Sequence, residues 1–280
     1  MGRWIDRAFR QGGTAPPPIP SVRRQGRQPP IRCTTAWRLC AAQKGLAGLQ
    51  VRAGGGIGRA LGLPLAPNGP KHAGMAVYLH EEDLPSADLL APGIVAVDTE
   101  TMGLITPRDR LCVVQISDGQ GDEHLVRFKV GSDYAAPNLR AVLADPARLK
   151  LYHFARFDLA AIHHYLGVMA TPVFCTKIAS KLVRTYTDRH GLKDLVRELL
   201  GKEISKQQQS SDWGGAVLSD AQLEYAASDV RYLHGAHSIL LERLVREKRS
   251  EIAQACFDFL PTRALLDIAG WADRDIFSHE

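Results

Sequence analysis

Three short apolar runs that follow one another between residues 93 and 128 constrain the fold of this chain most. GIVAVD (93–98), RLCVVQIS (110–117) and EHLVRF (123–128) each have the length of a strand, and turn-forming residues separate them. Beyond residue 128, helix-compatible and strand-like segments alternate. Consecutive strands followed by such alternation predict an α/β fold in which a mixed sheet is flanked by helices.

The remaining elements are predicted from periodicity and from helix start and stop signals. Strands are expected at 76–80, 150–154 and 172–176, and helices at 138–145, 157–167, 178–186 and 192–201. Gly167 and Gly201 are the expected helix stops. The capping-box pattern that begins at Ser219 predicts one long helix that continues to about residue 248.

Residues 1–74 differ in composition from the rest of the chain. They include PPPIP (16–20), GGG (54–56) and 12 of the 35 Lys and Arg residues, with Asp6 as their one acid. Because no periodicity persists there, a disordered basic extension is predicted, followed by a single domain at 75–280. An organelle-targeting peptide and a nucleic-acid-binding arm are alternatives. A non-native upstream extension is favoured, because Met75 opens the first strand-like run.

Charge and cysteine content limit the function classes. Residues 75–280 contain 23 basic and 29 acidic residues, so the overall pI of about 9.0 comes from the N-terminal segment. Nucleic-acid binding by the domain must therefore depend on local patches and metal ions. Five scattered cysteines without a CxxC pair predict a reducing, cytoplasmic location without a disulfide framework or zinc site. No run reaches the roughly 18 apolar residues of a membrane span, so no membrane partner is expected.

Asp98 and Glu100 form the first candidate site. They lie two residues apart at the end of the apolar run VAVD, and on a strand they would point to the same face. Adjacent carboxylates repel each other unless a cation joins them, and Mg²⁺ and Mn²⁺ favour such oxygen ligands. The alternative for this pair alone is a strand end whose acids face water.

Two further motifs carry candidate residues on helices. Asp158 lies where a strand leads into a helix, a position at which an acid also compensates the helix dipole. Tyr225 and Asp229 are four residues apart in the capped helix and so share one face, which could equally be a solvated face.

In this order the three motifs resemble the DEDD exonuclease superfamily in its tyrosine-bearing branch, and most closely ribonuclease D. The resemblance covers about residues 76–250. It also includes LCVVQI (111–116), GLKDL (191–195), KQQQSSDW (206–213) and LSDAQLEYAASDV (218–230). It implies a ribonuclease H-like fold and a metal-dependent 3′→5′ exoribonuclease that trims RNA, tRNA precursors among its substrates, to nucleoside 5′-monophosphates.

The resemblance also implies roles for single residues. Two divalent cations, Mg²⁺ or Mn²⁺, would be held by Asp98, Glu100, Asp158 and Asp229, with Asp98 between both ions and Asp158 acting through water. Tyr225 would orient the attacking water, because a phenol with an ordinary pKa near 10 is a poor base at neutral pH. Leu104 and Gln115 are the expected substrate contacts. Leu104 would either pack on the terminal base or be a buried leucine of its loop. Arg184, Arg189 and Lys193 form a basic group that either contacts phosphates or lies on a solvated face.

The sequence departs from the family pattern in two places. Phe154 stands before the Ala-Arg-Phe-Asp motif where many relatives have Asn, which puts one supporting hydrogen bond in doubt. Few residues follow the long predicted helix, so the helical nucleic-acid-binding domains of ribonuclease D are expected to be missing. A proofreading-type DNA exonuclease remains an alternative, because RNA specificity depends on contacts to the 2′-OH that a sequence does not show. An inactive binding module is disfavoured, because all four acids and the tyrosine are present.

Overall fold

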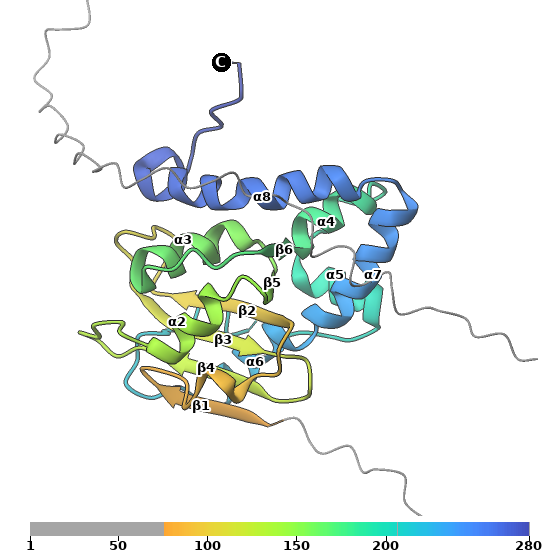
Figure 1. Cartoon of the computed structure of the whole chain (residues 1–280). Helices are drawn as coiled ribbons and strands as arrows, with labels where there is room; N and C mark the ends of the chain where they lie inside the picture. Colours follow the sequence, from red (N-terminus) through yellow and green to blue (C-terminus); the bar gives the residue numbers. More distant parts are fainter. Residues whose placement is uncertain (1–75, 206, 280) are drawn as a thin grey trace, which may run out of the picture. The chain divides into compact units, whose positions relative to one another are not determined.

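A computed structural model describes residues 76–205 and 207–279. Its six strands form one sheet in the order β1-β4-β3-β2-β5-β6 (Figure 1). The strands are β1 (Val77–Glu81), β2 (Ile94–Thr101), β3 (Leu111–Ser117), β4 (Glu123–Arg127), β5 (Leu149–Tyr152) and β6 (Val173–Cys175). β3 is antiparallel to β2 and β4, and the other neighbouring strands are parallel. This mixed sheet confirms the predicted ribonuclease H-like fold.

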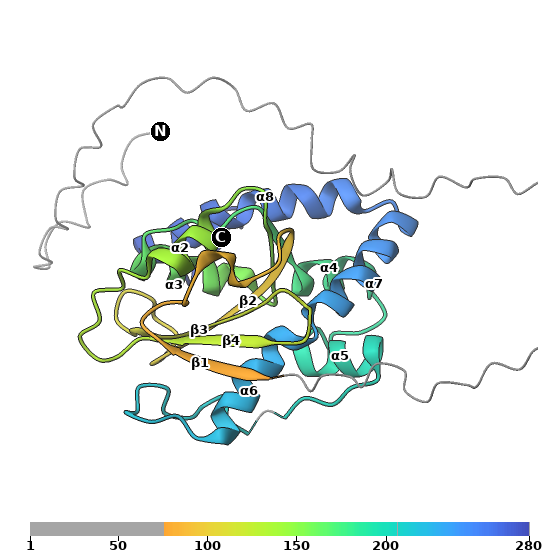
Figure 2. The ribbon, with the colours of Figure 1, turned by 60° about the horizontal axis from the view of Figure 1, so that its bottom comes forward.

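Helices cover both faces of the sheet. They are α2 (Pro137–Ala144), α3 (Ala155–Leu166), α4 (Thr176–Val183), α5 (Leu192–Leu200), α6 (Asp220–Arg231), α7 (Leu233–Arg246) and α8 (Ser250–Leu266). Two short turns of helix also occur, η1 (Ala87–Leu89) and η2 (Asp267–Trp271). Figure 2 shows α6 on one face and α2 and α3 on the opposite face, while α8 packs on α3.

Each face of the sheet has its own apolar core. The side chains of Val97, Val114 and Val126 join the larger core with residues of α2 and α3. Val113 and Leu125, which alternate with these positions, join a smaller core with Trp213 and residues of α6. Because side chains alternate along a strand, neighbouring residues of β2 also reach opposite faces. This alternation decides where the acids of β2 point.

The local signals in the sequence act as predicted at several element ends. Ser219 and Gln222 form both hydrogen bonds of a capping box at the start of α6. Gly167 and Gly201 end α3 and α5 in the left-handed conformation, with φ of 68° and 63°. Strands β2, β3 and β4 begin or end within three residues of their predicted limits. Local chemistry therefore accounts for much of the secondary structure.

The long helix predicted from Ser219 to about residue 248 is wrong as a single element. The chain turns at Tyr232, which separates α6 from α7. α6 packs on β1 to β4, whereas α7 packs on α4, α5 and the β2–β5 side of the sheet. These two surfaces need different helix axes. The break itself has no Gly or Pro, and the nearest glycine, Gly235, lies inside the first turn of α7. Tertiary packing is thus its cause.

The predicted disorder of residues 1–74 concerns a segment outside the described residues, and the domain boundary at 74/75 stays a prediction. Across 76–205 and 207–279, no helix combines the length and apolar character that crossing a membrane requires.

Candidate active site

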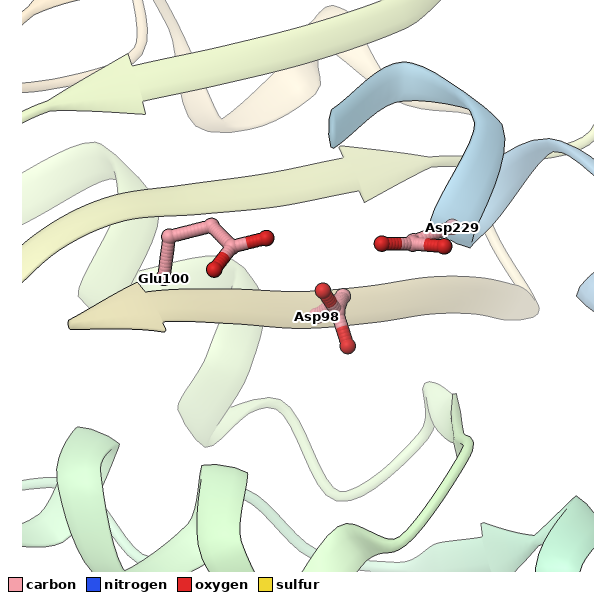
Figure 3. A group of neighbouring side chains, drawn as sticks. All are labelled: Asp98, Glu100 and Asp229. Atoms are coloured by element: carbon pink, nitrogen blue, oxygen red, sulfur yellow. The ribbon is translucent and has the colours of Figure 1, made fainter. Parts of the chain in front are cut away.

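Asp98 and Glu100 lie on the face of β2 that α6 covers. In the antiparallel pairing with β3, Asp98 is opposite Gln115 and Glu100 is opposite Val113, which belongs to the core under α6. Figure 3 shows both carboxylates beside that of Asp229, which comes from α6. Oxygens of the three side chains lie within 4.8 Å of one another. The structure therefore brings together three of the four predicted acids as one group.

Helix α6 is fixed in the position that brings Asp229 to the strand. Its capping box satisfies backbone groups at its start, and Gln222 Nε2 also donates to Ser211 Oγ and to the Asp212 carbonyl, both at 3.1 Å. Near its end, Arg231 pairs with the buried Glu123 of β4 at 2.9 Å. A buried ion pair with such geometry is costly to break from one side, so it maintains the register of α6 against the sheet.

Asp158 reaches the site from the opposite face. It lies in the first turn of α3 and is buried, with 3% of its surface exposed. Thr99, whose side chain points away from those of Asp98 and Glu100, donates a 2.8 Å hydrogen bond to Asp158 Oδ1. The fourth acid is therefore close to the group of three but is held separately.

The pKa values of Asp98, Glu100 and Asp158 are raised by burial and by the negative charges around them. Burial is the largest cause for Asp98, followed by the charges of Asp158, Asp229 and Glu100, and its pKa lies well above the usual range. Burial and the charges of Asp229 and Asp158 raise the pKa of Glu100 in the same way. Burial raises the pKa of Asp158 to about 7, although the hydrogen bond from Thr99 opposes this shift. Such a set of buried and half-buried carboxylates gains stability from a divalent cation, so the residues present fit a metal site.

Tyr225 lies one helical turn before Asp229 and donates a hydrogen bond to its carboxylate. Burial and the charges of Asp229, Glu100 and Asp98 raise the pKa of the phenol far above its ordinary value. Trp213, the last residue of the KQQQSSDW motif, packs against Tyr225 with ring centroids 6.0 Å apart. The phenol is therefore neutral at physiological pH and is held in place from two sides.

Asp98, Glu100, Tyr225 and Asp229 line a cleft of about 720 Å³. Leu104 is 83% exposed at its edge, on the loop that follows β2. Asp109 holds this loop by accepting hydrogen bonds from the Ile105 N–H and from Arg108. A Cβ at Gly103 would lie 2.4 Å from Asp109 Oδ2, so the loop requires glycine there. Leu104 is thus a large apolar side chain presented to the cleft, as its predicted contact with a base requires.

Gln115 and Arg184 are both buried and do not line the cleft. Gln115 is fully buried beside Asp98, does not line the cleft, and its amide has no hydrogen-bond partner among the described residues. Its predicted substrate contact stays a prediction, with less support than that of Leu104. Arg184 is also buried and pairs with Glu198, so a role in binding phosphate or a place on a solvated face is wrong for this residue.

The cations that do line the cleft are Lys193, which was predicted, and Lys177, which was not. Lys193 lies in the first turn of α5, where backbone N–H groups also favour anions. Lys177 has its ammonium 4.2 Å from the centroid of the Phe154 ring. The sequence contains no spacing that would have indicated this second lysine.

Phe154 adopts the left-handed conformation, with φ 77° and ψ 42°. Asn takes up this conformation far more readily than a bulky aromatic residue, which gives a physical reason for the Asn in many relatives. The Phe154 side chain is 43% exposed and forms part of the cleft wall. Here the chain combines a strained backbone with an aromatic surface next to the acids.

The sequence model of a 3′-5′ exonuclease family matches residues 81–245, which include every residue of the candidate site. The carboxylate cluster, which fits a metal ion, and the ribonuclease H-like sheet agree with this match. The chain belongs to this 3′-5′ exonuclease family.

Among solved structures, the chain is similar to NrnC of Brucella melitensis, with 56% identity and a TM-score of 0.71. The match covers 73% of this chain and 99% of NrnC. It also resembles ribonuclease D of Escherichia coli, with 25% identity, a TM-score of 0.54 and coverage of 61% and 44%. The curated ribonuclease D of Gluconacetobacter diazotrophicus is 37% identical over 155 residues, which are 55% of this chain and 39% of that protein. The chain thus spans about two fifths of such a ribonuclease D but nearly all of NrnC.

Proposed function

We propose that this protein is a 3′→5′ exoribonuclease that uses two divalent cations and releases nucleoside 5′-monophosphates from short single-stranded RNA. The observation that carries the proposal is the group of Asp98, Glu100 and Asp229 oxygens within 4.8 Å, with Asp158 and Tyr225 beside it. This is the residue set of the family motif, in the same order along the chain.

Asp98, Glu100 and Asp229 would hold one cation, and Asp98 and Asp158 would hold the second, with Asp158 acting through water. When bound, such a pair supplies the positive charge that an attacking hydroxide and a departing 3′-oxygen both need. The four carboxylates would fix the positions of the two cations. The bond from Thr99 to Asp158 and the packing of α6 keep the two sides of the site in register.

Tyr225 would orient the water that attacks the phosphorus atom. Burial and the neighbouring carboxylates raise the pKa of the phenol in the cation-free site, so we propose that the hydroxyl orients the water through hydrogen bonds and does not act as a base. Trp213 and Asp229 limit the positions that this hydroxyl can occupy.

Leu104, Lys177 and Lys193 are placed to contact the 3′ end of a nucleic acid. The exposed Leu104 side chain offers an apolar contact to the terminal base, and Lys177 and Lys193 offer charge to the phosphates. A 56%-identical NrnC has been solved with pGG bound and a 55%-identical one with Mg²⁺. The match over nearly the whole NrnC chain favours short RNA as substrate over the tRNA precursors expected from ribonuclease D. A cytoplasmic location remains part of this proposal.

DNA is the second candidate substrate. One curated relative is DNA polymerase I of Aquifex aeolicus, 34% identical over 180 residues, and hydrolysis with two metal ions can act on either backbone. Contacts to the 2′-OH would decide between the two substrates.

The proposal is tested with the purified full chain, Mg²⁺ or Mn²⁺, and RNA and DNA oligonucleotides of identical sequence, with pGG as the shortest substrate. We expect 5′-mononucleotides from the 3′ end of RNA, loss of turnover in excess EDTA, and no turnover by an Asp98→Ala control. Full activity in EDTA, or release of 3′-monophosphates, would contradict it. Faster cleavage of the DNA strand would move the assignment to the second candidate.

A further inference from the structure

A second cavity, of about 530 Å³, lies beside the cleft that the acids line. Its walls come from the start of α3, from α4 and α8, and from the segment 272–277 that follows η2. Figure 1 shows α8 lying across α3 and α4, on which it packs. Phe154 and Lys177 line both this α4–α8 cavity and the cleft, so the two spaces are continuous along a shared wall.

The α4–α8 cavity is basic, although the domain as a whole is acidic. Five cationic and two acidic side chains line it: Arg156, Lys177, Lys181, Arg263 and Arg274, with Asp273 and Asp275. Nucleic-acid binding by this domain requires a local patch of positive charge, because its net charge is negative. The cavity is such a patch, and it adjoins the proposed active site.

Two of these arginines fix the outer wall of the cavity. Arg156 and Arg263 both pair with Asp267, at 2.5 and 3.0 Å. Both also donate to the Ala272 carbonyl, at 2.6 and 3.0 Å. These bonds hold the segment 272–277 over α8, so the charge offered to a ligand comes from the other cations of the cavity.

Lys177 and Lys181 form a row of positive charge on α4. They are four residues apart in the helix and therefore lie on one face. Lys177 is at the boundary with the cleft, whereas Lys181 is exposed and lines the α4–α8 cavity alone. The row thus leads from the cleft into the cavity, as a groove that follows the backbone of a single-stranded nucleic acid does.

Aromatic rings accompany this row. Phe154 lies at the boundary and is 43% exposed, and Phe259 of α8 and Phe277 line the cavity. The rings of Phe259 and Phe277 pack on each other with centroids 5.7 Å apart. Single-strand binding sites combine such rings with a positive groove, because every base can stack on an aromatic ring.

We propose that the α4–α8 cavity binds the part of the RNA strand that lies upstream of the cleaved nucleotide. Lys177 and Lys181 contact phosphates of this strand, and Phe154 and Phe259 contact its bases. The inference rests on the proposed function, which places the 3′ end of the RNA at the acids. A dinucleotide then extends to the boundary at Phe154 and Lys177, and a longer strand continues to Lys181.

The kinetic test compares pGG with a heptaribonucleotide that ends in the same two nucleotides, using the full chain and Mg²⁺. The measured quantity is the KM of the heptamer divided by the KM of pGG. We expect this ratio to rise about 3-fold in Lys181→Gln, which loses one phosphate contact. In Phe259→Ala it should rise about 10-fold, because stacking on the ring is lost. Lys248→Gln is the matched control, since this exposed lysine lines neither space, and its ratio should stay the same.

A binding test does not need turnover. The heptamer is titrated into each protein in EDTA by calorimetry at several salt concentrations. In Lys181→Gln, the slope of log affinity against log salt concentration should be shallower by about 0.7, the share of one phosphate contact on a single strand. Phe259→Ala should lower the affinity and keep the slope. A purely structural role for Lys181 would leave the slope unchanged.

The inference is overturned if Lys181→Gln keeps both the KM ratio and the salt slope of the unchanged protein. Lys181 and Lys248 are both exposed, so this comparison stays decisive even where Phe259→Ala fails to fold. If the unchanged protein hydrolyses neither RNA, the proposed function fails. The heptamer titration still decides whether the cavity binds RNA, so the two failures are distinguishable.

Discussion

Thr99 donates its hydroxyl hydrogen to Oδ1 of Asp158 over 2.8 Å, and this bond joins strand β2 to the first turn of α3. It connects the middle residue of the D-T-E motif to an acid on the other face of the sheet. The motif therefore contributes three side chains to the site, two toward α6 and one toward α3.

Thr99→Val should show what the hydrogen bond to Asp158 contributes to stability and to metal binding. Valine keeps the shape of the threonine side chain and removes its hydroxyl. We expect a loss of stability of about 1 kcal/mol and weaker binding of Mn²⁺, since Asp158 loses its bond. Calorimetric titration and denaturant unfolding measure the two quantities. Unchanged Mn²⁺ affinity would show that Asp158 is held without Thr99.

Asp98→Ala and Tyr225→Phe should both slow turnover but should differ in their effect on Mn²⁺ binding. Asp98→Ala removes the proposed shared ligand, so it should lose both turnover and Mn²⁺ binding. Tyr225→Phe keeps the ring against Trp213 and should lower the single-turnover rate by about 10²–10⁴, with Mn²⁺ affinity nearly unchanged. A Tyr225→Phe enzyme with the unchanged protein's rate would make the tyrosine a packing residue.

The cation-free protein should become less stable as the pH rises through about 7. The folded-state pKa of Asp158 is raised from 3.8 to about 7, so its contribution is present below pH 3.8 and is lost as the pH rises through 7. His237 has the opposite effect on stability, and it acts at lower pH. Burial lowers its pKa to about 4, so stability is lost as the pH falls from 6.5 toward 4.

Melting temperatures in EDTA between pH 5 and 8 therefore report on Asp158, whose contribution falls up to about pH 7 and is level above it. Comparison with Asp158→Asn removes the opposing contribution of His237 below pH 6.5. We expect a decline with pH that Asp158→Asn reduces, and that saturating Mn²⁺ abolishes. A melting temperature that does not change over this range in EDTA would show that the acids are not under mutual repulsion.

Phe154→Asn should stabilise the fold while changing the cleft. The left-handed backbone of a bulky residue costs on the order of 1–3 kcal/mol, and the lysine–ring contact returns about 0.5–1 kcal/mol. We expect a net gain of about 1 kcal/mol in unfolding free energy. We also expect a higher KM for RNA, because the aromatic wall is lost. Phe154→Leu, which keeps the strain, is the control and should give no gain in stability.

Removal of residues 1–74 should leave the domain intact, because their composition offers no core to bury. A chain that begins at Met75 should keep its melting temperature and its turnover. Loss of cooperative unfolding would show that the first 74 residues are needed for the fold.

The sequence predicts most of this fold because its signals are local. The alternation in β2 places Asp98 and Glu100 together, and Ser219 with Gln222 fixes the start of α6. The break at Tyr232 and the helix α8, which contains Pro261, depend on packing between distant segments and have no such signal. The same holds for the site: the acids belong to short motifs, whereas Lys177 lines the cleft only because distant segments pack together.

The ion pair between Glu123 and Arg231 holds α6 on the sheet, and the formation of the cation site depends on that docking. Glu100 belongs to the second strand and Asp229 to a late helix, so the cation site exists only after a long loop of chain has closed. A cation held by both would act as a reversible cross-link, and part of its binding free energy would keep the loop closed. A chain that has lost the Glu123–Arg231 pair would then depend on its cations for the docking of α6.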